Sequence, residues 1–289
     1  MGLISKSEIK NLLRKYKIRP SKRLGQNFLI DKRVIKKMIE AAELKSEDTV
    51  LEIGPGIGAL TIELAKKVKK VIAIEKDPRM CKILKELLDC WTPPAHHPVR
   101  NVEIINKDVL KLTTDNLQLT TNYKVVANLP YYIVSTVIRK FLESTQVRPV
   151  QMVLMVQKEV AQRICAKPPD MNLLAVSVQF YAKPEIISYV SKKSFWPQPK
   201  VDSAILRIAP LINADRKLID ADLFFKIVKA GFSQPRKQIL NNLSKKLKLN
   251  KEEVKAWLLK NNIQPSQRAE TLNIEDWLEL TKSLKYNND

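Results

Sequence analysis

The feature that most constrains the fold is the stretch 49-TVLEIGPGIGALTIELAKK-67, in which a glycine turn separates two apolar segments. Val50 to Ile53 have the length and composition of a short buried strand, and the apolar residues from Leu60 to Ala65 recur at helical spacing. Glycines let a backbone approach a ligand closely, and the first turn of a helix offers free N–H groups. The stretch therefore predicts a strand, a ligand-binding turn and a helix in direct succession.

Strands and helices continue to alternate after this stretch. Strands are predicted over residues 71–77, 102–108, 124–128, the first half of 150–164 and the end of 194–208, and helices over 33–42, after Pro78, over 133–143 and in the second half of 150–164. This order is typical of βαβ units with a mostly parallel sheet. Beyond Pro210, the apolar residues of 222–285 have helical spacing only. We therefore expect an α/β domain over residues 1–210 and a small all-α domain over residues 211–289.

Two acidic residues end the strands that follow the glycine turn. Glu75 closes the second strand, where a carboxylate can accept hydrogen bonds from both ribose hydroxyls, and Asp108 closes the third, where it can meet an adenine amino group. The carboxyl ends of parallel strands share one edge of the sheet, where such folds bind ligands. The turn has the spacing Gly54-x-Gly56-x-Gly58 rather than the dinucleotide pattern, and the chain has no Gly-x-x-x-x-Gly-Lys-Ser/Thr. S-adenosylmethionine, an adenosine derivative without phosphates, is the cofactor that fits.

A fourth strand end carries Asn128, Leu129, Pro130 and Tyr131. An exocyclic adenine amine is a poor nucleophile because its lone pair is delocalised into the ring. Two acceptors, the Asn128 side-chain oxygen and a backbone carbonyl, most simply that of Leu129, can bind its two N–H protons and favour a tetrahedral nitrogen. Pro130 restricts the backbone that aims this carbonyl. The Tyr131 ring offers a face on which the base can stack, a contact that contributes about 1–3 kcal/mol.

A second aromatic face is available in the loop 194-SFWPQPKVDS-203. Phe195 or its neighbour Trp196 can close over the other side of the base, and the sequence does not choose between them. No strong general base is required, because the amine proton becomes acidic only once the nitrogen bears the methyl group.

Basic residues are concentrated in two segments. The chain has 51 Lys and Arg against 30 Asp and Glu, a formal net charge of +21. Residues 1–37 carry a net charge of +10, and residues 222–260 carry a net charge of +7. Such concentration favours a polyanion, nucleic acid before an anionic membrane surface, because neither segment places bulky aromatic residues in amphipathic order.

Other features exclude several classes of protein. No apolar run approaches the roughly 18 residues that span a bilayer, and the N-terminus lacks the apolar stretch of a secretory signal. Three cysteines make no disulfide framework. A short mitochondrial leader is compatible with the N-terminal composition, but we expect a cytoplasmic protein. The sequence brings together Cys81, Cys90, His96 and His97, but their spacing and the prolines around them indicate a surface loop rather than a metal site.

Several of these motifs together resemble the ribosomal RNA adenine N6-dimethyltransferase family. The stretches that carry the resemblance are 22-KRLGQNFLID-31, 52-EIGPG-56, 75-EKD-77, 128-NLPYY-132 and 195-FWPQPKVDS-203. The stretch 267-QRAETL-272 is similar to the branch of the family that acts on the bacterial small subunit. The resemblance extends over nearly the whole chain.

The resemblance implies a Rossmann-like class I methyltransferase domain followed by a helical RNA-recognition domain. It implies transfer of four methyl groups from S-adenosylmethionine to N6 of two adjacent adenosines near the 3′ end of 16S rRNA, in connection with ribosome biogenesis. The implied cofactor contacts are Asn27, Leu29, Gly54, Glu75, Asp108 and Asn128, to which the glycine turn adds Gly56. The residues implied to hold the target base are Asn128, Leu129 and Tyr131, with Phe195 as the further candidate. We expect a monomer with no membrane partner.

The target base must leave its stack to reach Tyr131, so the enzyme has to hold the surrounding RNA. We expect residues 1–37 to flank the entrance. In the C-terminal domain, the residues expected to contact phosphates of folded RNA are Arg236, Lys237, Lys245, Lys246 and Lys248.

The sequence departs from the family pattern at two places, and it is compatible with three alternative functions. Residues 172–181 lack the Tyr-Gly pair that the family often has, and the loop 91–100 is longer than usual. The alternatives are a large-subunit rRNA methyltransferase that gives antibiotic resistance, a ribosome-assembly or transcription factor independent of methylation, and a DNA adenine methyltransferase. The helical C-terminal segment favours the small-subunit enzyme over the first. Intact Glu75 and Asp108 argue against the second, and a DNA enzyme would more often carry proline at the position of Leu129.

Overall fold

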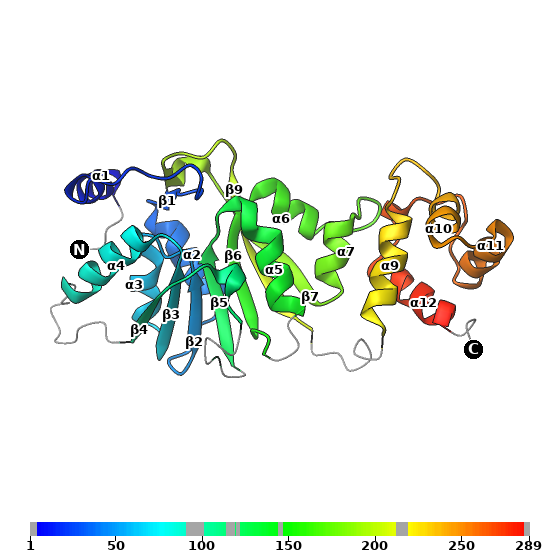
Figure 1. The fold of residues 1–289 in the computed structure, drawn as a ribbon, viewed down its shortest axis with the longest axis horizontal. Coiled ribbons are helices and arrows are strands. Elements are labelled where there is room, and N and C mark those ends of the chain that lie inside the picture. Colours follow the sequence, from blue (N-terminus) through cyan, green and yellow to red (C-terminus); the bar gives the residue numbers. More distant parts are fainter. Residues whose placement is uncertain are drawn as a thin grey trace. The chain divides into compact units, whose positions relative to one another are not determined.

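The computed structural model describes residues 5–90, 101–113, 119, 122–143, 147–211 and 219–285 (Figure 1). The chain forms two compact units. The sheet unit comprises Met1–Ala161 and Pro184–Pro210, and the helical unit comprises Gln162–Lys183 and Leu211–Asp289. Within the described ranges, none of the helices combines the length and the apolar composition that a membrane crossing needs.

The sheet unit is built on a seven-stranded sheet, counted over the described residues, in the order β4-β3-β2-β5-β6-β9-β7. Its strands in chain order are β2 (Thr49–Ile53), β3 (Lys70–Glu75), β4 (Val102–Asn106), β5 (Tyr123–Asn128), β6 (Gln151–Gln157), β7 (Ala182–Val190) and β9 (Ser203–Pro210). The first five strands in this order, β4, β3, β2, β5 and β6, pair in parallel with their neighbours. Strand β9 runs antiparallel to β6. The predicted α/β class with a mostly parallel sheet is confirmed.

The strand order reverses at β2. From β2 the chain builds outward through β3 to β4, and it then returns to place β5 on the other side of β2. Leu51 of β2 consequently lies opposite Ile72 of β3 and opposite Val125 of β5. Parallel sheets open a crevice at the carboxyl ends of their strands where the order reverses. The glycine turn after β2 and Asn128 at the end of β5 therefore lie at this crevice.

Several helices cover one face of the sheet, and two of them share a buried cluster. Met38 of α2 (Lys32–Ala41) and Leu64 of α3 (Ala59–Ala65) belong to one buried cluster with Val50 of β2 and Val126 of β5. Each helix presents one apolar stripe, which it buries against the sheet. The further helices of this part of the chain are α4 (Pro78–Cys90), α5 (Val134–Glu143) and α6 (Lys158–Ile164).

Periodicity alone did not predict three features of the sheet unit. Helix α1 (Lys6–Lys15) begins with a capping box at Ser5 and buries Ile9 and Leu13 in a cluster with Phe28. Strand β1 (Phe28–Leu29) pairs with β8 (Phe195–Trp196) in a separate two-stranded sheet. Two-residue strands carry no periodic signal. Strand β7 lies at the edge of the main sheet and alternates poorly between exposed and buried residues.

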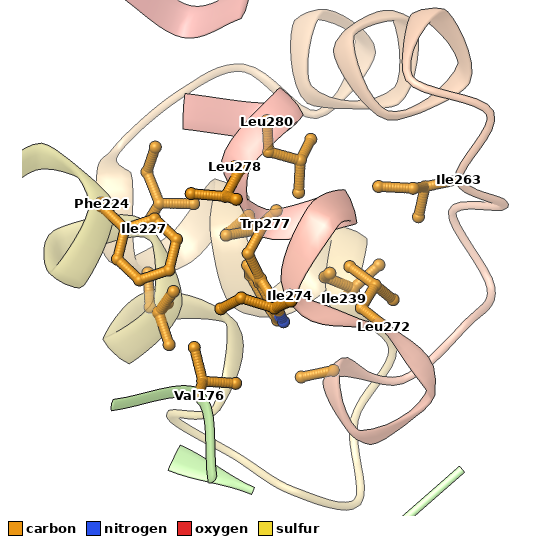
Figure 2. Packing of buried hydrophobic residues seen from close by; sticks show 14 of the residues in the cluster. Val176, Phe224, Ile227, Ile239, Ile263, Leu272, Ile274, Trp277, Leu278 and Leu280 are labelled. Atoms are coloured by element: carbon orange, nitrogen blue, oxygen red, sulfur yellow. The ribbon is translucent and has the colours of Figure 1, made fainter. Parts of the chain in front are cut away.

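The helical unit has its own hydrophobic core. Its helices are α7 (Leu173–Gln179), α9 (Ala221–Gly231), α10 (Ile239–Leu247), α11 (Lys251–Lys260) and α12 (Ile274–Lys285). Figure 2 shows the fully buried Trp277 of α12 in the middle of the cluster. The unit contains residues 162–183 in addition to the expected segment from residue 211, because α7 leads to Phe180, whose ring stacks on Phe224 of α9 with centroids 4.2 Å apart.

Gly231 closes α9 directly beneath Trp277. A Cβ atom at residue 231 would lie 2.4 Å from Cη2 of the Trp277 ring, far inside contact distance. We expect Gly231→Ala to destabilise the helical unit by about 1–3 kcal/mol, the usual cost of overpacking a core. The measurement is the urea midpoint of the helical circular dichroism signal. Lys229→Ala, an exposed change in the same helix, should leave the midpoint in place, and an equal midpoint for both variants would contradict the packing argument.

Candidate active site

A pocket opens at the carboxyl edge of the sheet, where the strand order reverses. Its walls come from the segment 24–29, the turn after β2, the ends of β3 and β5, the residues after β4, and Phe195. All of the residues predicted for cofactor or base contacts line this one pocket: Asn27, Leu29, Gly54, Gly56, Glu75, Asp108, Asn128, Leu129, Tyr131 and Phe195. The structure thus brings the predicted residues together, while their individual roles stay predictions.

The glycine turn lies in the left-handed region of backbone space. Gly54 and Gly56 have φ angles of 71° and 57°, which disfavour residues with a Cβ atom. A Cβ at residue 56 would also lie 3.3 Å from the Phe28 ring. The turn therefore exposes bare backbone to the pocket, with Phe28 packed close to it.

Glu75 ties the end of β3 to the glycine turn. Its Oε2 accepts the Gly56 N–H at 3.1 Å, and its Oε1 accepts the Asp77 N–H at 2.8 Å. The side chain is buried, and this burial raises its pKa above the ordinary value, although the two backbone N–H groups oppose the shift. A carboxylate oxygen can accept more than one hydrogen bond, so both oxygens keep acceptor capacity for a ligand.

Asp108 lines the pocket and caps the short 3₁₀ turn Val109–Lys111, which follows β4. Its Oδ2 lies 2.8 Å from Nζ of Lys76, and its Oδ1 accepts the Leu110 N–H at 3.0 Å. The hydrogen bond from Lys76 is the main cause that lowers the pKa of this carboxyl. Asp108 is therefore an ionised acceptor held in place from two sides.

Asn128 is oriented by the segment that crosses the pocket. Its Nδ2 donates to the backbone oxygen of Asn27 at 3.3 Å, and Nδ2 of Asn27 in turn donates to the Gly25 oxygen at 3.2 Å. This orientation leaves Oδ1 of Asn128 as an acceptor. Leu129 has its N–H bound to the Met155 oxygen at 3.3 Å and buries its side chain.

The two candidate stacking rings are held in different ways. The Tyr131 hydroxyl lies 2.9 Å from the Ser203 hydroxyl, and burial raises its pKa. Phe195 is 3% exposed and sits opposite Leu29 in the β1–β8 pair. Trp196 is opposite Phe28, and the described pocket lining includes Phe195 without it. Phe195 is therefore the better placed of the two residues that the sequence left open, and its role stays a prediction.

Sequence reasoning missed Glu52, although it belongs to the quoted glycine motif. Glu52 lines the pocket, is 2% exposed, and has an Oε2 atom without a hydrogen-bond partner in the described chain. Burial raises its pKa to about 8, the nearby Thr61 hydroxyl opposes this shift, and the charge of Glu75 adds to it. A glutamate within an apolar strand was the available signal, because buried carboxyls are rare without a partner.

Sequence reasoning also missed how the segment before β1 is fastened. Gln26 donates to Oδ2 of Asp77 at 3.0 Å and accepts the Ser21 N–H at 2.7 Å. Asp77 also binds the Arg79 guanidinium at 2.7 Å. The segment that orients Asn128 is therefore anchored to the chain that follows β3.

The part of the chain that the structure describes holds no cluster of three or more metal-ligating side chains. Cys81 donates to the Glu75 backbone oxygen over 3.7 Å, and burial raises the pKa of its thiol to about 11. His96, His97 and the 91–100 loop lie outside the described residues.

Comparison with known proteins gives consistent results. A family model described as "Ribosomal RNA adenine dimethylase" matches residues 18–286. The chain is 43% identical over 273 residues to Ribosomal RNA small subunit methyltransferase A of Dehalococcoides mccartyi, covering 94% of this chain and 90% of that protein. It is 41% identical over 288 residues to the protein of the same name from a Geobacillus species, covering 96% of each chain.

Solved structures match over a similar extent. The structure of a dimethyladenosine transferase from Plasmodium falciparum superposes with a TM-score of 0.74 at 28% identity, covering 90% of this chain and 98% of that one. The structure of the 23S rRNA methyltransferase ErmE superposes with a TM-score of 0.71 at 28% identity, covering 90% of this chain and all of that one.

The raised pKa of Glu52 predicts a pH-dependent stability. An unfolded glutamate loses its proton near pH 4.5, whereas the folded residue keeps it to about pH 8. The folded state then binds more protons in this window, so stability should fall as the pH rises from 4.5 to 8. We expect Glu52→Gln to melt near the wild-type temperature at pH 5 and above it at pH 8, in thermal melts without cofactor. Glu47→Gln, which changes an exposed carboxyl, is the control; equal pH slopes for Glu52→Gln and wild type would contradict the burial argument.

Proposed function

The chain belongs to the ribosomal RNA adenine dimethylase family, and from this premise we propose its substrate, its cofactor contacts and the roles of its pocket residues. The substrate is a pair of adjacent adenosines near the 3′ end of 16S rRNA in the small ribosomal subunit, each dimethylated at N6 with S-adenosylmethionine as donor. The protein acts as a monomer in the cytoplasm, in connection with small-subunit biogenesis.

One observation carries the proposal. A single pocket is lined by the glycine turn, by the carboxyls of Glu52, Glu75 and Asp108, and by the segment Asn128–Tyr131 at the end of β5. The first two suit a nucleoside cofactor, and the third suits an adenine amine. The pairing of β2 with β5 places them next to each other, at the distance of neighbouring strands.

The charges of the pocket fit S-adenosylmethionine. In a dinucleotide site, the N–H groups of the glycine turn are turned toward phosphates. Here Glu75 accepts the Gly56 N–H, and one oxygen of Glu52 in the same pocket has no partner among the described residues. These carboxyls leave a phosphate without the N–H group that it would need, and a bound cation would favour their ionised forms. S-adenosylmethionine has no phosphate and carries a sulfonium and an ammonium group, and when bound it supplies an electrophilic methyl group.

The cofactor contacts follow from the positions of the acceptors. The Glu75 carboxylate oxygens accept hydrogen bonds from the ribose hydroxyls through the lone pairs that the Gly56 and Asp77 N–H groups do not use. Asp108 accepts from the adenine amino group. Asn27 and Leu29 close the site from the crossing segment, and Gly54 admits the cofactor close to the backbone.

Asn128 and Leu129 hold the target amine. The Asn128 amide donates to Asn27, so its Oδ1 is available to accept one N6 proton. The Pro130 oxygen is engaged by the Ile133 N–H at 3.1 Å, whereas the Leu129 oxygen has no such partner among the described residues. The Leu129 carbonyl is therefore the better second acceptor. Two fixed acceptors pull the nitrogen toward a tetrahedral shape and orient its lone pair, and water takes the proton after transfer.

Tyr131 and Phe195 hold the target base between them. Both rings line the pocket, one from the end of β5 and one from β8. Stacking on aromatic faces is sequence-tolerant and contributes about 1–3 kcal/mol per base. It offsets part of the cost of taking the adenosine out of its stack.

Small-subunit RNA is favoured over the alternatives by the comparisons. The relatives at 41–43% identity are named for the small subunit, whereas the 23S rRNA enzyme ErmE is 28% identical. A large-subunit enzyme, a factor independent of methylation and a DNA enzyme remain the outcomes that the substrate test must separate.

The substrate test is methyl transfer from labelled S-adenosylmethionine to unmethylated 30S subunits, with 50S subunits, 23S rRNA and DNA in parallel. We expect label on 30S alone, recovered as N6,N6-dimethyladenosine. Asn128→Ala removes one acceptor and should lower the rate by about 100-fold or more, the size expected for a fixed transition-state contact. Label on 23S rRNA or DNA would replace the substrate, and tight 30S binding without any label would replace the enzyme by a binding factor.

The basic segments are expected to hold the RNA. Lys245, Lys246 and Lys248 are exposed at the end of α10. Reversing all three charges to Glu should weaken binding to 30S subunits and flatten its dependence on salt, because each lost phosphate contact lowers the slope by roughly 0.7–0.9. The measurement is a binding titration at several salt concentrations.

A matched control reverses the charges of Lys66, Lys67 and Lys69, which are exposed between α3 and β3, at the sheet edge opposite the pocket. It should leave the slope unchanged. Equal effects of the two triple variants would indicate a nonspecific charge effect and would remove the end of α10 from the RNA footprint.

A further inference from the structure

Ser203 is a polar residue at a position where packing alone would favour an apolar one. It begins β9, is 0% exposed, and lies opposite Gln157 of β6, with the fully buried Ala204 and Ile205 after it. A buried hydroxyl costs free energy unless it forms a hydrogen bond. The partner of the Ser203 hydroxyl is the Tyr131 hydroxyl, 2.9 Å away.

Tyr131 has few other constraints. It stands in a 3₁₀ turn (Tyr131–Ile133) after β5, and the next residue, Tyr132, is 59% exposed. Backbone hydrogen bonds hold its neighbours, from Leu129 N–H to Met155 and from Ile133 N–H to Pro130. For the side chain itself, the bond to Ser203 is the one hydrogen bond found among the described residues. The far end of the ring is therefore anchored at Ser203.

The residue before Ser203 fastens the opposite wall of the pocket. The Asp202 carboxylate accepts the Lys192 N–H at 2.9 Å, at the start of the short turn Lys192–Ser194 that leads into Phe195. The Asp202 backbone oxygen accepts the Lys158 N–H at 3.0 Å. Phe195 and Tyr131 thus take their positions from adjacent residues of one chain segment.

We propose that Ser203 is a positioning residue, which acts through the Tyr131 hydroxyl to fix the gap between the Tyr131 and Phe195 rings. This inference rests on the proposed function, in which that gap receives the target adenine. The anchor fixes the direction of the ring axis. The O–H bond and the acceptor lone pair of a phenol both lie near the ring plane, so an anchored hydroxyl resists rotation of the ring about that axis whichever hydroxyl donates.

The anchor matters most when the base is already bound. Stacking itself requires only an aromatic face, which phenylalanine would offer as well. Methyl transfer requires in addition that the adenine nitrogen lies in line with the methyl group, and errors of about 1 Å lower such rates strongly. Loss of the anchor should therefore lower kcat more than it weakens substrate binding.

The test is a double-mutant cycle of Ser203→Ala and Tyr131→Phe, assayed with unmethylated 30S subunits. Each single change should lower kcat by about 3- to 10-fold, the equivalent of one hydrogen bond, with KM and cofactor affinity within about twofold. The double variant should be no slower than the slower single one, because both changes remove the same bond. Losses that multiply, or wild-type kcat in either single variant, would overturn the proposal.

Tyr131→Phe also gives a readout that does not depend on whether Ser203→Ala folds. It removes one oxygen from a half-buried residue and leaves strand β9 intact, so its kcat remains informative if Ser203→Ala fails to fold. The matched control is Tyr123→Phe, which removes a tyrosine hydroxyl bound to the Val147 oxygen at 3.2 Å, at the other end of β5. It should leave kcat unchanged, and an equal fall in kcat for Tyr123→Phe would mean a general loss of order rather than positioning.

The outcomes separate this inference from the proposed function. A wild-type protein that methylates no RNA would overturn both. A wild-type protein that methylates 30S subunits, with Ser203→Ala equally active, would overturn the positioning role alone.

Discussion

The site depends on the parallel pairing of β2 with two strands that are distant in sequence. Its pairing with β3 brings Glu75 to the glycine turn, and its pairing with β5 brings Asn128 to the other side of that turn. Strand register sets both distances, while the left-handed glycine turn and the segment around Asn27 complete the pocket. The hydrogen bond from Gly56 to Glu75 then fixes the turn against the sheet. A shift of β5 by one residue would turn Asn128 to the opposite face and would separate it from the glycine turn and Glu75.

The surface and the pocket of the protein have different electrostatic requirements. Its surface must attract a polyanion, and the formal net charge of +21 serves this purpose. Under the proposed function its pocket must attract a cationic cofactor, and Glu52, Glu75 and Asp108 line this pocket. Burial raises the pKa of Glu52 to about 8, so at neutral pH this carboxyl adds little negative charge, and burial also raises the pKa of Glu75 above its ordinary value. A bound cation would favour their ionised forms. Placing the carboxyls inside the pocket, Glu52 and Glu75 on strands and Asp108 on the turn after β4, keeps them away from RNA phosphates, which they would repel.

The sequence predicted the parts of the site that depend on local patterns. Strand, glycine turn and helix formed one short motif, and Glu75 ends β3 as predicted. Asp108 was expected to end its strand as well, but β4 ends at Asn106 and Asp108 caps the turn that follows, still on the common edge. The β1–β8 pair could not be predicted, because two-residue strands have no period. The Glu52 oxygen that has no partner among the described residues was equally hidden, since the burial of Glu52 depends on tertiary packing. The chain from residue 162 to 183 joins the helical unit through Phe180, a contact with no local signal.

Pairs of polar residues that meet across the fold are the hardest features to derive from sequence. Tyr131 and Ser203 are 72 residues apart, and each has an ordinary local explanation, a turn tyrosine and a serine at a strand start. Only the return of β9 antiparallel to β6 brings them together. Changing one member alone leaves the hydroxyl of the other without its partner, and burying an unpaired hydroxyl costs free energy. A stacking ring with such a buried partner is therefore held in one place, whereas a ring that met the base through apolar contacts alone would be free to adjust to it.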